Sequence, residues 1–471
     1  MLPSKLEVLL ILFSLFLPSF AYASTYLKLD DDAYILLERL EAEGVIKSSL
    51  LTTKPLSYKE VGRLVKEAEE NSKGRSPYIR AIVNYLKSRF SDELKDIKFI
   101  KPAETVYLKY HYQDSLSQLL NYNNDGDTFK RGANLRVGFG TRIELKGISF
   151  YLNPEGRSSE DNDALLKWGY GIWSVKGIDL QIGKDSKWWG PCYHGALLVS
   201  NNAEPFTMIS LTNPEPVLLP WVFKYLGPFR FNLFVTRLEK KREIPKPYLW
   251  GMRLNFKPLP YIEIGLQRTA ILGGKGRSEN LNTWFKSFTG KGENEPGIEA
   301  GDQKGGGDIK ITIPWKIQPF QVYLEAAGED EAGGLPSNWA YIFGVYLPRI
   351  GNIEELSLRV EYAKTTEVWY RHHIYKDGYT YKNRIIGHYM GTDGEDLYTE
   401  ITYHLPELGI FSIFYDKWRN IEYNKIKEVG LKANIRVKDA IQLGLRYSYG
   451  RVSGSSKKDI NLLSIILSYN F

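Results

Sequence analysis

The chain has 471 residues, which is too long for one ordinary core, so we expect two structural parts. Its mean hydropathy of −0.32 excludes a bundle of membrane-spanning helices, while 32 tyrosines and 11 tryptophans suit a barrel with aromatic belts at a membrane interface. The net charge of +7 is a mild bias toward acidic partners without a dense basic run, so nucleic acid is not an expected partner, and the single Cys192 excludes an internal disulfide.

Residues 1–23 have the pattern of a secretory signal. Lys5 supplies the positive start, Leu9–Phe20 is the apolar region, and Ala21–Ala23 gives the small-x-small cleavage pattern. We therefore expect the mature chain to start at Ser24. No later segment offers about 18 consecutive apolar residues, so no spanning helix is expected.

Residues 24–100 are predicted to form a small periplasmic bundle of three helices. Asp30–Asp32 suit the first helix start, Ser57–Glu60 is a capping box, and Ser76–Pro77 places a proline at the first position of the third helix. Apolar residues follow each start at helical spacing. The apolar faces most simply cover one another; a docking surface for a periplasmic partner is the alternative.

Residues 101–471 change to an alternating pattern with a period of two. The clearest case is Val429–Val437, where apolar and polar residues alternate, followed by a short turn and a second alternating run from Ile441. About 16–18 such segments predict a mainly β fold, a transmembrane antiparallel β-barrel of about 18 strands with a small N-terminal α-helical bundle. A soluble β-sandwich is the alternative, and it would hide the apolar faces inside.

The last strand supports a membrane location. Apolar residues alternate from Leu463 to the terminal Phe471, the form of signal that the outer-membrane insertion machinery reads. We therefore expect that machinery and outer-membrane lipid as partners.

The polar residues of the alternating strands are predicted to face the lumen. Opposite charges there can pair across strands and narrow the lumen, whereas the alternative is the solvated wall of a porin. The predicted lumen-lining residues are Arg136, Arg142, Glu144, Arg253, Glu263, Arg359, Glu361, Lys432, Arg436 and Arg446.

The segment Gly183–Pro220 differs from the other strands and loops in composition. Aromatic rings stand beside acids, amides and bases in this part of the sequence. The rings are those of Trp188, Trp189 and Tyr193, together with Trp221. Rings can cover the apolar face of a pyranose while polar groups bind its hydroxyls, so this composition suits a sugar-binding surface. Simple packing of the tryptophans is the alternative.

Four blocks resemble a known family. GKDSKWWGPCYHGALLVSNNAEPF, LTNPEPVLLPW, LGPFRFNLFVTRLE and Leu249–Gly274 are similar to the Wzi-type capsule assembly proteins. The resemblance runs from Gly183 to Gly274, continues more weakly in LKLDDDAYILLERLEAEGVI, and past Ile309 is limited to generic barrel strands. It implies an outer-membrane β-barrel with a small periplasmic helical part, acting as a lectin that holds capsular polysaccharide at the cell surface.

The residues expected to bind sugar come from two sources, the block that matches the family and the charge of the long loops. Basic loop residues would attract the carboxylates of an acidic capsular polysaccharide or exopolysaccharide, and tryptophans would stack on its sugar rings. Other capsule export proteins could bind the helical part. The candidates from the matching block are Trp188, Trp189, His194, Asn201, Asn202 and Glu204, and those from the loops are Lys275, Arg277, Lys286, Arg371 and Lys376.

A substrate-specific porin or polysaccharide export channel is the alternative function. A barrel of this width is a wide aqueous pore unless it is plugged. Leu272–Gly307 and Gly183–Pro220 both offer material for a plug, which favours the lectin. The chain contains no HExxH, GxSxG or paired CxxC motif, so we expect no enzyme activity, no cofactor and no metal site.

Overall fold

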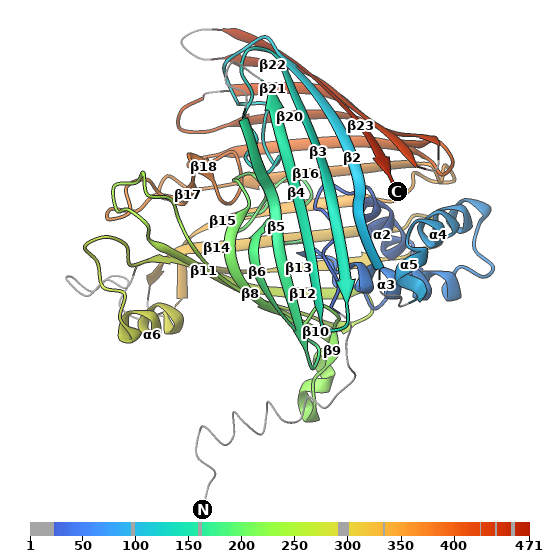
Figure 1. The fold of residues 1–471 in the computed structure, drawn as a ribbon, viewed down its shortest axis with the longest axis horizontal. Coiled ribbons are helices and arrows are strands. Elements are labelled where there is room, and N and C mark those ends of the chain that lie inside the picture. The colour runs from blue at the N-terminus through green and yellow to red at the C-terminus, as the bar shows by residue number, and fades with distance from the viewer. Residues whose placement is uncertain are drawn as a thin grey trace, which may run out of the picture.

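The computed structural model describes residues 23–95, 99–158, 163–290, 301–332, 335–423, 425–438, 440–453 and 457–471. The expected secretory signal, apart from Ala23, lies outside these residues. The chain forms a small group of helices and then a large antiparallel sheet that closes on itself (Figure 1). Within the described ranges, no helix is both long and apolar enough to cross a membrane.

The described residues build a closed barrel of 18 strands, as predicted. Each strand pairs with its neighbours in the chain, and β2 closes the barrel by pairing with both β3 and β23. The strands are β2 (Phe99–Gln113), β3 (Gly132–Leu145), β4 (Ile148–Ser158), β5 (Asp163–Val175), β6 (Ile178–Asp185), β8 (Phe206–Thr212), β10 (Pro228–Arg237), β11 (Tyr248–Leu259), β12 (Ile262–Leu272), β13 (Asp302–Ile313), β14 (Phe320–Ala332), β15 (Leu335–Leu347), β16 (Leu356–Lys364), β19 (Glu395–Leu405), β20 (Gly409–Arg419), β21 (Lys425–Lys438), β22 (Ile441–Ser453) and β23 (Lys458–Asn470). Short strands lie beside them: β1 (Thr53–Lys54) pairs with β7 (Trp188–Trp189), β9 (Val217–Leu218) with β10, and β17 (Thr380–Tyr381) with β18 (Arg384–Ile385).

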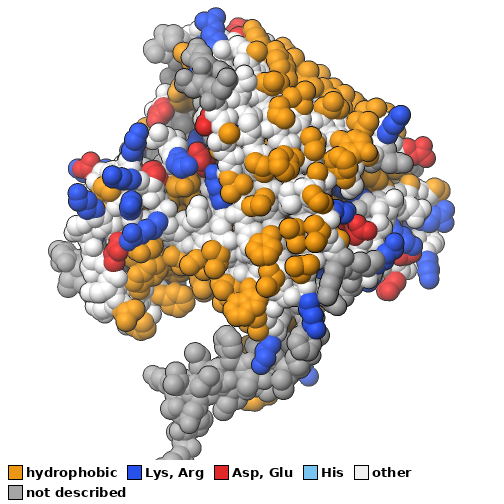
Figure 2. Space-filling view, viewed as in Figure 1, with side chains coloured by type: hydrophobic (Ala, Val, Ile, Leu, Met, Phe, Trp, Pro, Cys, Tyr) orange, Lys and Arg blue, Asp and Glu red, His pale blue; other side chains and the backbone are white. Residues whose placement is uncertain are grey.

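The outer face of the barrel is apolar. Val429, Leu431 and Val437 are 46%, 53% and 54% exposed, so these side chains point outward from β21. Figure 2 shows apolar side chains scattered over the strands in the middle of the view, with charged side chains gathered toward the two ends. An apolar band between polar ends is typical of a barrel surrounded by lipid. In a soluble sandwich Leu431 would be buried, so that alternative is wrong.

The inner face is charged, and its charges pair. Arg253 Nη1 lies 2.6 Å from Asp308 Oδ2, and Lys432 Nζ lies 2.9 Å from Glu400 Oε2. All ten residues that the alternation assigned to the lumen lie on strands with their side chains toward the interior. Their contacts include interior acids, backbone carbonyls and parts of the chain that fill the barrel. The interior is therefore a packed polar network.

The helices at the end with short turns are α2 (Ala33–Ala42), α3 (Tyr58–Asn71), α4 (Pro77–Arg89) and α5 (Ser91–Lys95) (Figure 1, right). Ser57 Oγ accepts a hydrogen bond from Glu60 N, and Ser76 Oγ accepts one from Ile79 N, so both predicted helix starts are capped. The second half of the capping box is not made, because the Glu60 carboxylate binds Arg63. The apolar faces of α2, α3 and α4 pack into one core.

The N-terminal segment, residues 23–57, enters the barrel and does not stay in a separate bundle. Glu41 of α2 binds Lys257 and Lys310 on the inner wall. Farther along, Arg230 donates hydrogen bonds to the carbonyls of Thr53 and Pro55. Inward-facing charged residues of the strands thus bind several of residues 23–57, which belong to the range 24–100 predicted as a periplasmic bundle.

The long connections lie at the opposite end. Residues 186–205, here called the plug segment, fold into the lumen, and so does much of the connection 365–394, which buries Trp369 and Tyr379. The connection after β12 does not enter the lumen in its helical part. Its helix α6 (Leu281–Thr289) lies on the outside of the barrel, where Trp284 packs on Tyr248. The prediction that Leu272–Gly307 supplies a plug is therefore wrong for α6; residues 291–300 lie outside the described chain.

Candidate functional site

The two tryptophans of the plug segment are buried inside the barrel. Trp188 and Trp189 form β7 and pair with β1 of the N-terminal segment. Trp189 is 0% exposed and packs on Phe234, while Trp188 is 6% exposed and donates its indole N–H to the carbonyl of Cys192 at 3.0 Å. Neither ring offers a free face, so their burial does not fit the sugar-stacking role expected from the sequence. Trp221, in the 3₁₀ helix η1 (Trp221–Leu226), lies at the other end of the barrel.

Acids of the barrel wall hold the backbone of the plug segment. Glu361 accepts hydrogen bonds from the backbone N–H groups of Tyr193 and His194 at 2.7 and 2.8 Å. Glu325 accepts one from Leu197 N at 3.0 Å. The backbone N–H groups of an irregular segment are not paired within a helix or sheet. When such a segment is buried, its N–H groups need acceptors from other parts of the chain. The wall acids supply them and fix the plug segment in place.

The remaining candidates of the plug segment have different surroundings. His194 is buried and stacks on Tyr398 with ring centres 3.6 Å apart. Asn202 donates from Nδ2 to the carbonyl of Ile385, and Asn201 is buried beside it. Glu204 is partly exposed and forms an ion pair of 2.6 Å with Lys382. Of these four, Glu204 has a position that an external ligand can reach.

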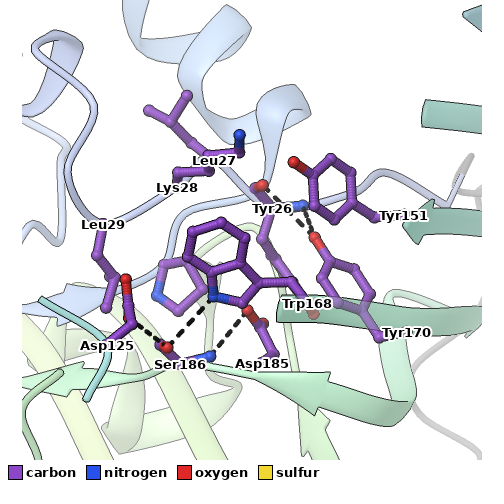
Figure 3. Close-up of a pocket in the computed structure, with 11 residues that line it drawn as sticks. Tyr26, Leu27, Lys28, Leu29, Asp125, Tyr151, Trp168, Tyr170, Asp185 and Ser186 are labelled. Atoms are coloured by element: carbon purple, nitrogen blue, oxygen red, sulfur yellow. Dashed lines mark hydrogen bonds between the residues drawn. The ribbon is translucent and has the colours of Figure 1, made fainter. Parts of the chain in front are cut away.

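A small cavity lies between the N-terminal segment and the inner wall (Figure 3). Its lining combines the rings of Trp168 and Tyr170 with Asp125 and Ser186, whose hydroxyl donates to Asp125 Oδ1 at 2.6 Å. Burial raises the pKa of Asp125 to about 6. Rings beside acids resemble a sugar site, but Trp168 and Tyr170 are only 7% and 5% exposed. The cavity is too enclosed for a polymer, and its rings serve mainly to pack the interior.

Three loops join into one surface at the plug-segment end. Arg242 donates to the carbonyls of Gly378 and Thr380, so the loop 238–247 contacts the connection 365–394. The third loop, residues 273–280, joins them through a hydrogen bond from Tyr375 Oη to Gly273 O.

The outside of these loops is rich in cations. We call it the basic loop surface, and it consists of Lys240, Lys241, Lys246, Lys275, Arg277, Arg371, Lys376 and Lys382. The structure thus brings together Lys275, Arg277, Arg371 and Lys376, which the sequence named separately, whereas Lys286 lies on α6 against the outer wall.

Several cations of this surface have no acidic partner among the described residues. In the part of the chain that the structure describes, no carboxylate lies within ion-pair distance of Lys240, Lys241, Lys246 or Lys275, although Lys376 pairs with Glu243. The sequence reasoning missed three of these four lysines. The run Lys240-Lys241-Arg242 was the available signal, but nothing in the sequence placed it beside Lys275.

Comparison with known proteins identifies the family. The family model described as Capsule assembly protein Wzi matches residues 112–460. The chain belongs to the Wzi capsule assembly family. The resemblance seen in the segment Gly183–Gly274 is thereby confirmed.

Two relatives illustrate the range of the Wzi family. A Klebsiella pneumoniae protein, named an uncharacterized 55.8 kDa protein in the cps region, is 28% identical over 332 residues, which are 69% of this chain and 62% of that relative. The chain thus spans less than two thirds of that relative's length. The solved structure of Escherichia coli Wzi superposes with a TM-score of 0.77 at 22% identity, covering 95% of this chain and all of that one. That protein is described as a carbohydrate-binding outer-membrane β-barrel involved in group 1 capsule assembly, and the likeness shows a shared fold.

Proposed function

We propose that this protein is a lectin-like barrel of the outer membrane that binds capsular or extracellular polysaccharide and helps to assemble or retain the capsule. Family membership and the apolar outer band support this function. The helices would then lie in the periplasm, and the basic loop surface would face outward. The observation that carries the proposal is the lumen filled by residues 23–57, the plug segment and part of the connection 365–394, because a barrel filled in this way can act through its surface and not through a pore.

Both ends of the lumen contribute to its closure. At the helical end, Glu41 of α2 is bound to two lysines of the wall. At the loop end, Glu325 and Glu361 bind the backbone of the plug segment. Removing one partner of a buried ionic contact typically costs about 3–5 kcal/mol, so spontaneous opening is unfavourable. This closure argues against the porin and export-channel alternative.

The basic loop surface is the proposed polysaccharide site. Four lysines have no carboxylate partner in the described part of the chain, and each can attract a carboxylate of an acidic polymer: Lys240, Lys241, Lys246 and Lys275. Each exposed contact is weak, but one long polymer can occupy many barrels and several contacts at once, which strengthens retention. Glu204 and Lys382 form the edge of this surface and could bind hydroxyls. The buried Trp188 and Trp189 would act indirectly, by holding the plug segment under the loops.

Two further expectations accompany the proposal. The exposed sides of α3 and α4 could bind other capsule export proteins in the periplasm, since only their inner sides are used in packing. Catalysis is not part of the proposed role, and it would be tested by incubating the protein with polysaccharide and following chain length.

The test compares two variants with equal charge changes. The loop variant carries Lys240→Gln, Lys241→Gln, Lys246→Gln and Lys275→Gln. The control variant carries K66Q, K73Q, R80Q and K95Q on the helices and the turn between α3 and α4 at the other end, where these side chains are also exposed. Binding of an acidic capsular polysaccharide to the purified proteins is measured at several salt concentrations.

The loop variant is expected to bind at least about tenfold more weakly, because several contacts are lost together, while the control binds like the unmodified protein. Binding of the unmodified protein is expected to weaken as salt rises, since exposed charges are screened. Equal binding by the two variants would overturn this surface as the site.

A further inference from the structure

Two aspartates lie together inside the barrel, with no lysine or arginine partner among the described residues. Asp396 of β19 and Asp416 of β20 are 3% and 0% exposed. Among the described residues, no lysine or arginine lies within ion-pair distance of either one. Removing two negative charges from water without a counter-charge is strongly unfavourable. Three other buried acids of the inner wall do have such partners: Glu400 with Lys432, Glu428 with Arg446, and Asp308 with Arg253.

The groups that do contact the aspartates supply too few protons. Tyr389 Oη lies 2.6 Å from Asp396 Oδ2, 3.0 Å from Asp416 Oδ2 and 2.7 Å from His194 Nε2, but it has a single proton to donate. His194 Nε2 lies 3.2 Å from Asp416 Oδ2. Tyr122 Oη lies 3.3 Å from the same oxygen, but its one proton is shared with Glu428 Oε2 at 2.9 Å. The Oδ1 atoms of both aspartates are buried and have no hydrogen-bond partner among the described residues. The cluster therefore has more acceptors than donors.

A neighbouring histidine does not supply the missing charge. His388 Nε2 lies 3.8 Å from Asp396 Oδ2. The His388 ring is buried, and its unprotonated Nδ1 makes it neutral. Its Nδ1 accepts a hydrogen bond from Met390 N, which leaves the proton on Nε2 and makes that atom a poor metal ligand.

We propose that His194, Asp396 and Asp416 form a buried binding site for one divalent metal ion of the zinc or manganese class, with Tyr389 at the fourth position. One imidazole nitrogen and two carboxylate oxygens are ligands that such ions accept. Their ligand atoms lie within 4.8 Å of one another, and the separations of His194 Nε2 from the two carboxylates are 3.2 and 3.9 Å. Metal–ligand distances of about 2.0–2.2 Å place tetrahedral ligand atoms about 3.3–3.6 Å apart, so small shifts of these side chains suffice.

The ion would connect three parts of the chain at the loop end. His194 belongs to the plug segment, Tyr389 belongs to the connection 365–394, and the aspartates belong to the wall. A single ion would therefore fasten both irregular segments to adjacent strands and stabilise the closed lumen. This role differs from polysaccharide binding, because the site is buried beneath the basic loop surface.

The test uses the full, tag-free protein in detergent. The protein is incubated with Zn²⁺, unbound metal is removed by desalting, and bound metal is measured by mass spectrometry. We expect about one zinc ion per chain, the capacity of one tetrahedral site, and a thermal unfolding midpoint that falls when EDTA removes it. The double variant D396N/D416N should lose the ion, whereas E400Q, which alters a buried acid on the same face of β19, should keep it.

His194→Gln provides a second variant if the double variant does not fold, and it too should lose the ion. The proposal is overturned if the folded, unmodified protein retains neither Zn²⁺ nor Mn²⁺ at this stoichiometry; the two aspartates would then share a proton instead. Retention of the ion by folded D396N/D416N or H194Q would also overturn it.

Discussion

Lys257 Nζ of the barrel wall lies 2.7 Å from Glu41 Oε1 of helix α2. Lys310 Nζ binds the other carboxylate oxygen at 2.6 Å, so one glutamate ties α2 to two strands. All three side chains are buried. The helix therefore closes its end of the lumen as a bound part of the barrel, and Glu41 is the residue on which this attachment can be tested.

Glu41→Gln is expected to lower the free energy of unfolding by about 3–5 kcal/mol at neutral pH, because it leaves two buried lysines without their shared carboxylate. Unfolding of the purified barrel in detergent measures the change. Lys59→Gln, which breaks a partly exposed ion pair with Glu215, serves as the control and should cost at most about 1 kcal/mol. Similar losses for both variants would contradict the role given to Glu41.

The pKa of Glu41 also predicts how the stability of the folded protein depends on pH. Burial favours a higher pKa, but Lys257 and Lys310 outweigh it and lower the pKa of Glu41 from 4.5 to about 2. A lowered pKa in the folded state stabilises the protein above pH 4.5, and this contribution is lost as the pH falls from there to about 2. The stability difference between the unmodified protein and Glu41→Gln should therefore shrink over this range. A difference that stays constant would show that the carboxylate charge is not what matters.

Trp189→Ala should destabilise the barrel without directly removing a sugar contact. The indole is fully buried against Phe234, and truncating such a ring typically costs about 3–5 kcal/mol. Trp188→Phe loses mainly the hydrogen bond to Cys192 O, worth about 1 kcal/mol, and keeps most of the packing.

Polysaccharide binding by folded Trp188→Phe should therefore equal that of the unmodified protein. Binding and unfolding would be measured on the same samples. A folded Trp188→Phe protein with lost binding would restore Trp188 as a sugar-contact residue.

Much of the fold was predictable because it depends on local pattern. The alternation around Leu431 places apolar side chains outward and Lys432 inward, since successive side chains of a strand point to opposite faces. The same rule identified Glu361 as a lumen residue. It could not show that Glu361 would bind the backbone of the plug segment, because that contact joins irregular and regular parts distant in the chain.

The contents of the lumen were harder to predict for the same reason. Trp188 and Trp189 have the composition of a sugar site, but only the fold shows that β1 covers them. The approach of His194 to Asp396 and Asp416 likewise joins positions about 200 residues apart, which no motif spacing reveals. Hydrophobic periodicity describes faces of single elements and contains no information on what fills the barrel.

The pKa of Asp125 is shifted in the opposite direction to that of Glu41, so it predicts the opposite effect of pH on stability. Burial raises its pKa from 3.8 to about 6, so its charge destabilises the folded state above that pH, and the penalty disappears as the pH falls toward 3.8. Asp125→Asn can still accept the hydrogen bond from Ser186 and tolerates the positive φ of 59° at this position.

The Asp125→Asn variant should therefore be more stable than the unmodified protein at neutral pH, and the two should converge in mild acid. Thermal unfolding across this pH range measures the effect. A variant that is less stable at neutral pH would contradict the burial argument.

The most direct test of the closed lumen is single-channel recording on the purified barrel in a planar lipid bilayer. The unmodified protein should insert without steady conductance, because the N-terminal segment and the plug segment fill the lumen from both ends. Large, stable conductance steps, of the size expected for an open barrel of this width, would contradict the account and favour a transport function.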